Sequence, residues 1–272
     1  MGVGAWCYLT LIILSILVVG LAYWKNPNKL LLLHYFAVSG AVLFFDYIVY
    51  SWGNAYTYYP GIIKGKYDTH IGALINAQII PSFSILYIAF QCKWYWSVVL
   101  AAFFTGIEFL FRYLEIFKGH WWKEWFTFVL LVPFFPMMKT WWGKLEQRPK
   151  KLLSFLTLVS AFYTIFTQLN VILYAVLKLR TIHVEWITQL TRQSTTITSP
   201  IGILFGMIVS ILIIFEAHNF WYFLSSISFL IFDASLKSVG IVQTDHIILE
   251  SILSFSTFLI PMLFVKYFST NR

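Results

Sequence analysis

The sequence of 272 residues has few charged side chains and almost no cysteine. Only 11% of the chain is charged, with 19 basic and 11 acidic residues, whereas a soluble domain has about 25%. This scarcity excludes a soluble enzyme and a disordered chain. The two cysteines, Cys7 and Cys92, exclude a disulfide-stapled secreted domain and make no metal or redox motif. Hydrophobic residues make up 60% of the chain, so we expect a multi-pass integral membrane protein.

Long apolar segments, separated by proline, glycine and clusters of charge, run along the whole chain. A helix needs about 20 apolar residues to cross the hydrocarbon core of a bilayer. The alternating pattern of barrel strands is absent, so the sequence predicts an all-α, polytopic transmembrane helical bundle of about nine spans, within a range of eight to ten. The expected spans are 3–24, 30–52, 71–92, 95–117, 125–142, 152–177, 201–217, 220–241 and 246–268.

We expect these spans to form two membrane units. Residues 1–145 predict an N-terminal five-helix unit, and residues 146–272 predict a C-terminal unit of about four helices. The sequence also has a weak internal similarity, because segments 45–53 and 232–240 share Phe-Asp, Ser and Gly at the same spacing. Parallel repeats of a three-helix unit would produce such a similarity, although chance explains a match of this size more simply.

Basic residues in the loops predict the orientation. Lysine and arginine are more frequent on the side of the first loop, 25–29, and are densest in the loop 139–151. The positive-inside rule then places the N-terminus outside and the C-terminus in the cytoplasm. Anionic lipid headgroups at the 139–151 loop explain the net charge of +8, so we expect membrane lipids and no nucleic acid as partners. Tryptophans near span ends predict an interfacial belt made of Trp24, Trp52, Trp94, Trp121, Trp122, Trp141 and Trp142.

Polar residues inside the spans are the main functional candidates, because an ionisable group in hydrocarbon is costly unless it is paired or hydrated. Glu108 and Arg112 are four residues apart and can pair on one helix face, and Asp233 and Lys237 have the same spacing. Each pair is either a structural ion pair or part of a polar interior that handles an ion or a substrate. The polar intramembrane candidates are Asp46, Asn76, Gln78, Glu108, Arg112, Asp233 and Lys237.

Prolines inside the expected spans can kink a helix, either for packing alone or to expose a carbonyl group to a binding site. The run Asn76-Ala-Gln78-Ile-Ile-Pro81-Ser82 is the most polar of these places. We therefore expect a cavity beside it.

Four histidines fall on the expected outer face, each near a carboxylate in the sequence. Imidazole and carboxylate groups together bind divalent metals, but these residues lack the spacing of a ligand motif. We interpret them as solvated loop residues, with a metal site as the weaker alternative, and we expect no cofactor. The four are His70, His120, His183 and His246.

Six short patterns carry a resemblance to known proteins. They are Trp24-Lys25-Asn26, the span around Asp46, Tyr58-Tyr59-Pro60, Gln78-x-x-Pro81-Ser82, Gly106-Ile107-Glu108 and Gly119-His120-Trp121-Trp122-Lys123. Over about residues 24–145 the chain resembles a family of uncharacterised multipass membrane proteins of endospore-forming bacteria. That resemblance implies a location in the bacterial plasma membrane and implies no activity.

A fainter similarity is to the membrane-embedded lycopene cyclase domain of carotenoid biosynthesis. It is carried by Asp46, Gly53 and Tyr56, and again by Glu108 and Gly119-His120-Trp121. It implies acid chemistry on an isoprenoid. The family has Pro-Leu-Glu-Glu where this chain has the acid-free Asn76-Ala77-Gln78, and cyclisation driven by a proton needs an acid close to the double bond.

Three functions are compatible with these features, and nucleotide-binding motifs are absent. The first is transport or sensing of a small or lipid-like solute through a polar intramembrane site. The second is an intramembrane enzyme acting on an isoprenoid or another lipid, with Glu108 as the acid and Asp46 or Asp233 in support. The third is a non-catalytic structural membrane subunit, for which the expected small-xxx-small spacing occurs only sporadically.

Overall fold

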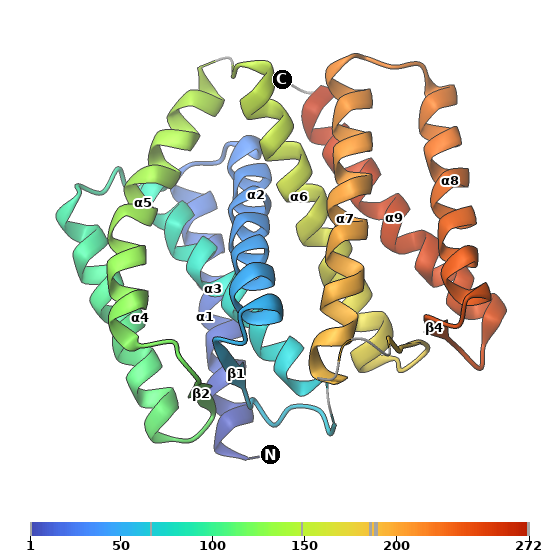
Figure 1. The fold of residues 1–272 in the computed structure, drawn as a ribbon. Helices are drawn as coiled ribbons and strands as arrows, with labels where there is room; N and C mark the ends of the chain where they lie inside the picture. Colours follow the sequence, from blue (N-terminus) through green and yellow to red (C-terminus); the bar gives the residue numbers. More distant parts are fainter. Residues whose placement is uncertain (1, 66, 148, 185–186, 188–189, 271–272) are drawn as a thin grey trace. The chain divides into compact units, whose positions relative to one another are not determined.

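The computed structural model describes residues 2–65, 67–147, 149–184, 187 and 190–270. Within them nine α-helices form, which confirms the predicted all-α fold (Figure 1). Seven of these helices are long and apolar enough to cross a membrane, so the chain is a multi-pass helical membrane protein. The seven are α1 (Val3–Lys25), α2 (Lys29–Asp46), α3 (Asp68–Ala89), α4 (Tyr95–Tyr113), α6 (Lys151–Val171), α7 (Leu190–Ile214) and α9 (Ile247–Thr270). The other two described helices, α5 (Glu124–Glu146) and α8 (Asn219–Ser238), have the length of a span but fall outside this apolar set.

The chain divides into two compact units, Met1–Pro149 (unit 1) and Lys150–Arg272 (unit 2). Unit 1 contains α1 to α5, and unit 2 contains α6 to α9. After α1, both units follow one plan. A helix ends in a wide π-helical turn, a short strand follows, two helices come next, a second strand pairs with the first, and a last helix completes the unit.

This plan repeats with a constant offset of 125 residues. The π-helical turns η1 (Tyr47–Trp52) and η2 (Ile172–Val176) begin at 47 and 172, and the strands β1 (Tyr56–Tyr58) and β3 (Thr181–Ile182) begin at 56 and 181. The second strands, β2 (Phe117–Gly119) and β4 (Val242–Gln243), begin at 117 and 242. This offset differs from the spacing of the two similar segments found in the sequence, because it aligns Asp233 with Glu108 and not with Asp46. The structure therefore indicates an internal duplication of a four-helix unit.

Local sequence features explain how unit 1 folds around its strands. The Asn28 side chain caps α2 by accepting a hydrogen bond from Leu30 N at 3.0 Å. Strands β1 and β2 pair antiparallel, with Tyr56 opposite Gly119 and Tyr58 opposite Phe117. These pairings bring the end of η1 and the end of α4 to the same end of the unit.

The first turn of α1 lies at this same end of unit 1. A Cβ atom on Gly4 would come within 2.8 Å of the Pro60 carbonyl oxygen, just after β1. Glycine is therefore needed for the close approach of α1 to the β1–α3 loop. The start of α1 and the β1–β2 pair consequently share one end of the unit (Figure 1).

In unit 2, strands β3 and β4 also pair antiparallel, with Thr181 opposite Gln243. Helix α7 begins at Leu190, well before the expected start at 201. Hydroxyl groups explain the difference, because Thr196 and Thr198 donate to the carbonyl oxygens of Arg192 and Ser194, one turn earlier, at 2.8 and 2.7 Å. These local bonds satisfy polar side chains that read as a loop in the sequence.

The lipid-facing surface is apolar, but the tryptophans divide into two groups. Trp24, Trp52 and Trp94 are exposed, as expected for an interfacial belt. Trp122 and Trp142 are buried, with 7% and 3% of their surface exposed, so the belt interpretation is wrong for these two.

Candidate functional site

A cavity of about 440 Å³ lies within unit 1, among the helices α1 to α5 and the two strands. Its volume is in the range of about 300–1,000 Å³ typical of small-molecule sites. Apolar and aromatic side chains form most of its wall. The polar lining residues are Asp46, Asn76, Glu108 and Thr127, together with the phenols of Tyr8, Tyr56 and Tyr58.

Asp46 is a polar lining residue with a buried oxygen atom that lacks a partner within the described part of the chain. It is the last residue of α2, immediately before the π-helical turn η1, and only 5% of its surface is exposed. Tyr56 donates a hydrogen bond to Asp46 Oδ1 at 2.5 Å, while Asp46 Oδ2 is buried and has no hydrogen-bond partner among the described residues. A buried polar atom in this state costs about 1–3 kcal/mol, so a ligand that supplied a donor would stabilise the site. Wide π-turns of this kind occur frequently at functional sites.

Tyr56 is held as a hydrogen-bond donor. Burial, and then the nearby Asp46 carboxyl group, raise the pKa of Tyr56 well above its usual value. The phenol therefore keeps its proton at neutral pH and donates a hydrogen bond to Asp46. Its ring also packs edge-on against Trp122 and tilted against Phe117, with centroids 5.5 Å apart in both cases.

Glu108, by contrast, is fully engaged. Its Oε1 accepts from Arg112 Nη2 at 2.8 Å, as the spacing of four residues predicts, and its Oε2 accepts from the Thr127 hydroxyl. Arg112 also pairs with Glu124 at 3.0 Å. One cation thus serves two carboxylates, and α4 is joined to the start of α5.

Glycine permits this position of Arg112. The guanidinium donates through Nη2 to the Trp122 carbonyl oxygen at 2.8 Å. A Cβ on Gly119, the last residue of β2, would come within 2.6 Å of Arg112 Nη2 and of the Trp122 oxygen. No other residue at position 119 leaves that space free.

Asn76 and Gln78 lie close together on α3 but have different roles. Asn76 lines the cavity with Ile79 and Ile80. These three residues belong to the run 76–82, beside which the sequence predicts a cavity. Gln78 instead joins α2 and α3, because its amide accepts from Tyr35 at 2.7 Å and donates to Ser39 at 3.0 Å. Gln78 is therefore a packing contact and not a cavity residue.

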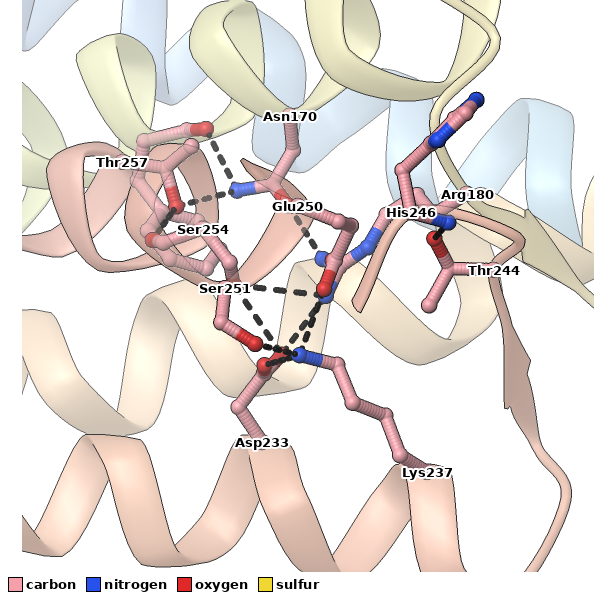
Figure 2. A network of polar contacts seen from close by, with 11 residues as sticks. Asn170, Arg180, Asp233, Lys237, Thr244, His246, Glu250, Ser251, Ser254 and Thr257 are labelled. Atoms are coloured by element: carbon pink, nitrogen blue, oxygen red, sulfur yellow. Dashed lines mark hydrogen bonds and ion pairs between the residues drawn. The ribbon is translucent and has the colours of Figure 1, made fainter. Parts of the chain in front are cut away.

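The second polar cluster lies in unit 2 and is shown in Figure 2. The expected pair of Asp233 and Lys237 forms, with Nζ 2.7 Å from Asp233 Oδ2. Two further residues join it. Glu250 pairs with Lys237 at 2.5 Å, and Arg180 pairs with Glu250 at 2.7 Å and with Asp233 at 2.6 Å.

Neutral side chains complete this cluster. Asn170 accepts from Arg180 at 3.1 Å, and Ser254 donates to Asp233 at 3.0 Å. The adjoining space is only about 10 Å³, room for roughly one water molecule. Two cations and two carboxylates therefore balance in a closed interior, which is the arrangement of a structural ion network.

The predicted residues thus divide among three places. Asp46, Asn76 and Glu108 line one cavity with Arg112 behind Glu108, Asp233 and Lys237 belong to the separate network of unit 2, and Gln78 is a packing contact. Sequence reasoning missed Tyr56, Thr127 and Trp122 in the cavity and Arg180 in the network. The offset of 125 residues is a signal in the sequence that aligns Glu108-x-x-x-Arg112 with Asp233-x-x-x-Lys237. It does not identify any of the four missed residues.

The four histidines do not gather. His120 contacts the Thr57 hydroxyl at 3.0 Å, and His70 is buried beside Tyr50 and Tyr67. In the part of the chain that the structure describes, no group of three or more His, Cys, Asp or Glu side chains is arranged to hold a metal ion.

No family model, curated protein or solved structure matches this chain. The fold and the cavity define it as a multi-pass helical membrane protein with a mostly apolar cavity in unit 1.

Proposed function

We propose that unit 1 binds a lipid-like molecule inside the membrane and that the protein transports or senses it. The observation that carries this proposal is the cavity of about 440 Å³, whose wall is mostly apolar and contains a few polar groups. Ligand sites have this composition, with apolar contacts for affinity and a few polar groups for orientation. A small hydrophilic solute would leave most of the wall without a matching partner.

A photoreactive lipid analogue tests this function. The full-length protein in phosphatidylcholine nanodiscs is irradiated with dodecanol that carries a diazirine in its chain, and the labelled peptides are mapped by mass spectrometry. We expect labels on α2, α3 and α5 next to the cavity. Labels found only on the lipid-facing surface would contradict the proposal.

Two matched variants separate cavity labelling from surface labelling. Ala41→Phe fills the cavity from α2, whereas Ala102→Phe adds the same ring to an exposed position on α4. Ala41→Phe is expected to remove the labels next to the cavity and Ala102→Phe to leave them unchanged. Movement of a fluorescent dodecyl analogue across proteoliposomes then distinguishes transport from sensing.

An intramembrane enzyme acting on an isoprenoid or another lipid is the alternative function. The observation in its favour is Asp46, which lines the apolar cavity and whose Oδ2 has no partner among the described residues. Glu108 is engaged by Arg112 and Thr127, so Asp46 takes the place of the acid in this alternative. A lipid profile that changes on overexpression of the protein, and not of Asp46→Asn, would favour it.

The proposed location is the plasma membrane of a bacterium, with the N-terminus outside and the C-terminus in the cytoplasm. The basic residues of 139–151 support this orientation, although Arg148 lies outside the described residues. These residues would contact anionic lipid headgroups on the cytoplasmic side. In this orientation the β1–β2 end of unit 1, with Asp46 and Tyr56, lies toward the outer face.

A further inference from the structure

The two units differ in their balance of buried charge, which bears on the ligand of the cavity. In unit 2, Arg180 and Lys237 face Asp233 and Glu250, so cations and carboxylates are equal in number. In unit 1, Arg112 faces both Glu108 and Glu124, and no cation among the described residues pairs with Asp46. Unit 1 therefore has an excess of carboxyl groups around its cavity.

One equivalent position gives unit 2 a cation that unit 1 lacks. Arg180 directly precedes β3 in unit 2, and Ala55 directly precedes β1 in unit 1, 125 residues earlier in the repeat. Arg180 reaches the carboxylates of unit 2, whereas Ala55 has no charge to offer. The exposed Lys118 and Lys123 do not line the cavity, and the described lining residues include no lysine, arginine or histidine.

Aromatic rings surround the acidic end of the cavity. Trp122 lies edge-on to Phe45 and Tyr56, with centroids 6.0 and 5.5 Å apart, and Phe117 packs against Tyr56. Phe117 already carries one cation, since the Arg112 guanidinium lies 5.3 Å from its ring centroid. Carboxylates and aromatic faces together are the chemistry that binds ammonium groups.

We propose that the cavity of unit 1 takes an amphiphile with an apolar chain and a protonated amine head, held by Asp46 Oδ2 and the rings of Tyr56 and Trp122. This inference rests on the proposed function and adds the ligand class. A protonated amine supplies both the hydrogen-bond donor that Oδ2 lacks and the charge that Arg180 supplies in unit 2. A fatty acid or phosphate head would add a negative charge to a wall without a cation of its own.

Three probes that differ only in the head group test this class. Each has the same dodecyl chain with a diazirine, and the heads are a primary amine, a hydroxyl and a carboxylate. The full-length protein in phosphatidylcholine nanodiscs is labelled with each probe at neutral pH, and the labelling of cavity peptides is quantified. We expect the amine to label about tenfold more strongly than the hydroxyl, and the carboxylate to label least.

Variants show which carboxyl group is responsible for the preference for the amine probe. Asp46→Asn should lower labelling by the amine about tenfold and leave labelling by the hydroxyl nearly unchanged. Glu108→Gln is a second variant that lowers the negative charge without touching Asp46, and it should weaken the amine preference to a smaller extent. Glu115→Gln removes an exposed carboxylate of the same unit and should change nothing.

The outcomes separate the two proposals. Cavity labelling of equal strength by all three probes would overturn the amine class and leave the proposed function standing. An amine preference that survives in both Asp46→Asn and Glu108→Gln would also overturn it. Absence of cavity labelling with every probe would overturn the proposed function itself.

Discussion

Tyr56 and Asp46 are joined by a hydrogen bond across the π-helical turn η1, with the Tyr56 hydroxyl 2.5 Å from Asp46 Oδ1. The turn widens the end of α2 and is followed by a bend that returns the chain as β1. Tyr56 thereby fixes one oxygen of the carboxyl group, which lines the cavity, and the other oxygen has no partner among the described residues. This bond joins the shape of the backbone to the chemistry of the site.

Removing the Tyr56 hydroxyl should destabilise unit 1. In Tyr56→Phe, Asp46 Oδ1 loses its buried donor, and the expected loss is about 1–3 kcal/mol in the free energy of unfolding. Denaturant titration of the purified protein in detergent measures it. Tyr59→Phe is the matched control, because Tyr59 is exposed and should tolerate the change. Equal effects of the two variants would contradict the role assigned to Tyr56.

In unit 2, a single neutralisation should cost more than a balanced pair of neutralisations. Arg180→Gln leaves Asp233 and Glu250 with Lys237 alone and should destabilise the protein by about 3–5 kcal/mol. The double variant Arg180→Gln with Glu250→Gln removes one charge of each sign and should recover part of that loss. Unfolding in detergent compares the two.

The control for this pair is Lys178→Gln, which removes an exposed cation two residues before Arg180. It should leave the stability of the protein unchanged. A double variant no more stable than Arg180→Gln alone would show that charge balance is not what holds the network together.

The ion pairs within single helices were predictable from the sequence, whereas the contacts between elements were not. Glu108 with Arg112 and Asp233 with Lys237 follow from helical spacing, which is a local property. Arg180 lies in a polar segment near Lys178 and reads as a loop residue. Its burial, with 4% of its surface exposed, depends on strand pairing between residues far apart in the sequence.

The exposure of two neighbouring tryptophans was likewise not predictable from the sequence. Trp121 and Trp122 are indistinguishable by composition, yet Trp121 is 48% exposed and Trp122 is 7% exposed. Their directions are set by the chain between β2 and α5, where Trp122 Nε1 donates to Thr127 at 3.0 Å. Hydropathy identifies the membrane segments because it sums over many residues, but it does not resolve the direction of one side chain.

Gly119 should be intolerant of a side chain, unlike a glycine of the neighbouring helix. In Gly119→Ala the new Cβ would lie 2.6 Å from Arg112 Nη2 and from the Trp122 oxygen, so the guanidinium must shift away from Glu108 and Glu124. We expect a loss of stability and of cavity labelling by the dodecyl amine probe. Gly106→Ala, where nothing lies within 4 Å of the added atom, should change stability by no more than about 1 kcal/mol. A tolerated Gly119→Ala would show that Arg112 does not depend on this close approach.

Single cysteines test the proposed orientation, on which the outward placement of the cavity end depends. In a chain with Cys7 and Cys92 replaced by serine, Lys64→Cys lies at an exposed position in the loop between β1 and α3, and Lys144→Cys lies at an exposed position in the last turn of α5. A membrane-impermeant maleimide added to intact bacterial cells should label position 64 and reach position 144 only after the cells are broken. Because β1 joins η1 to the loop before α3, label at 64 also places Asp46 toward the outer leaflet. The opposite pattern would invert the topology and put the acidic end of the cavity on the cytoplasmic side, so that an amine ligand would enter from the inner leaflet.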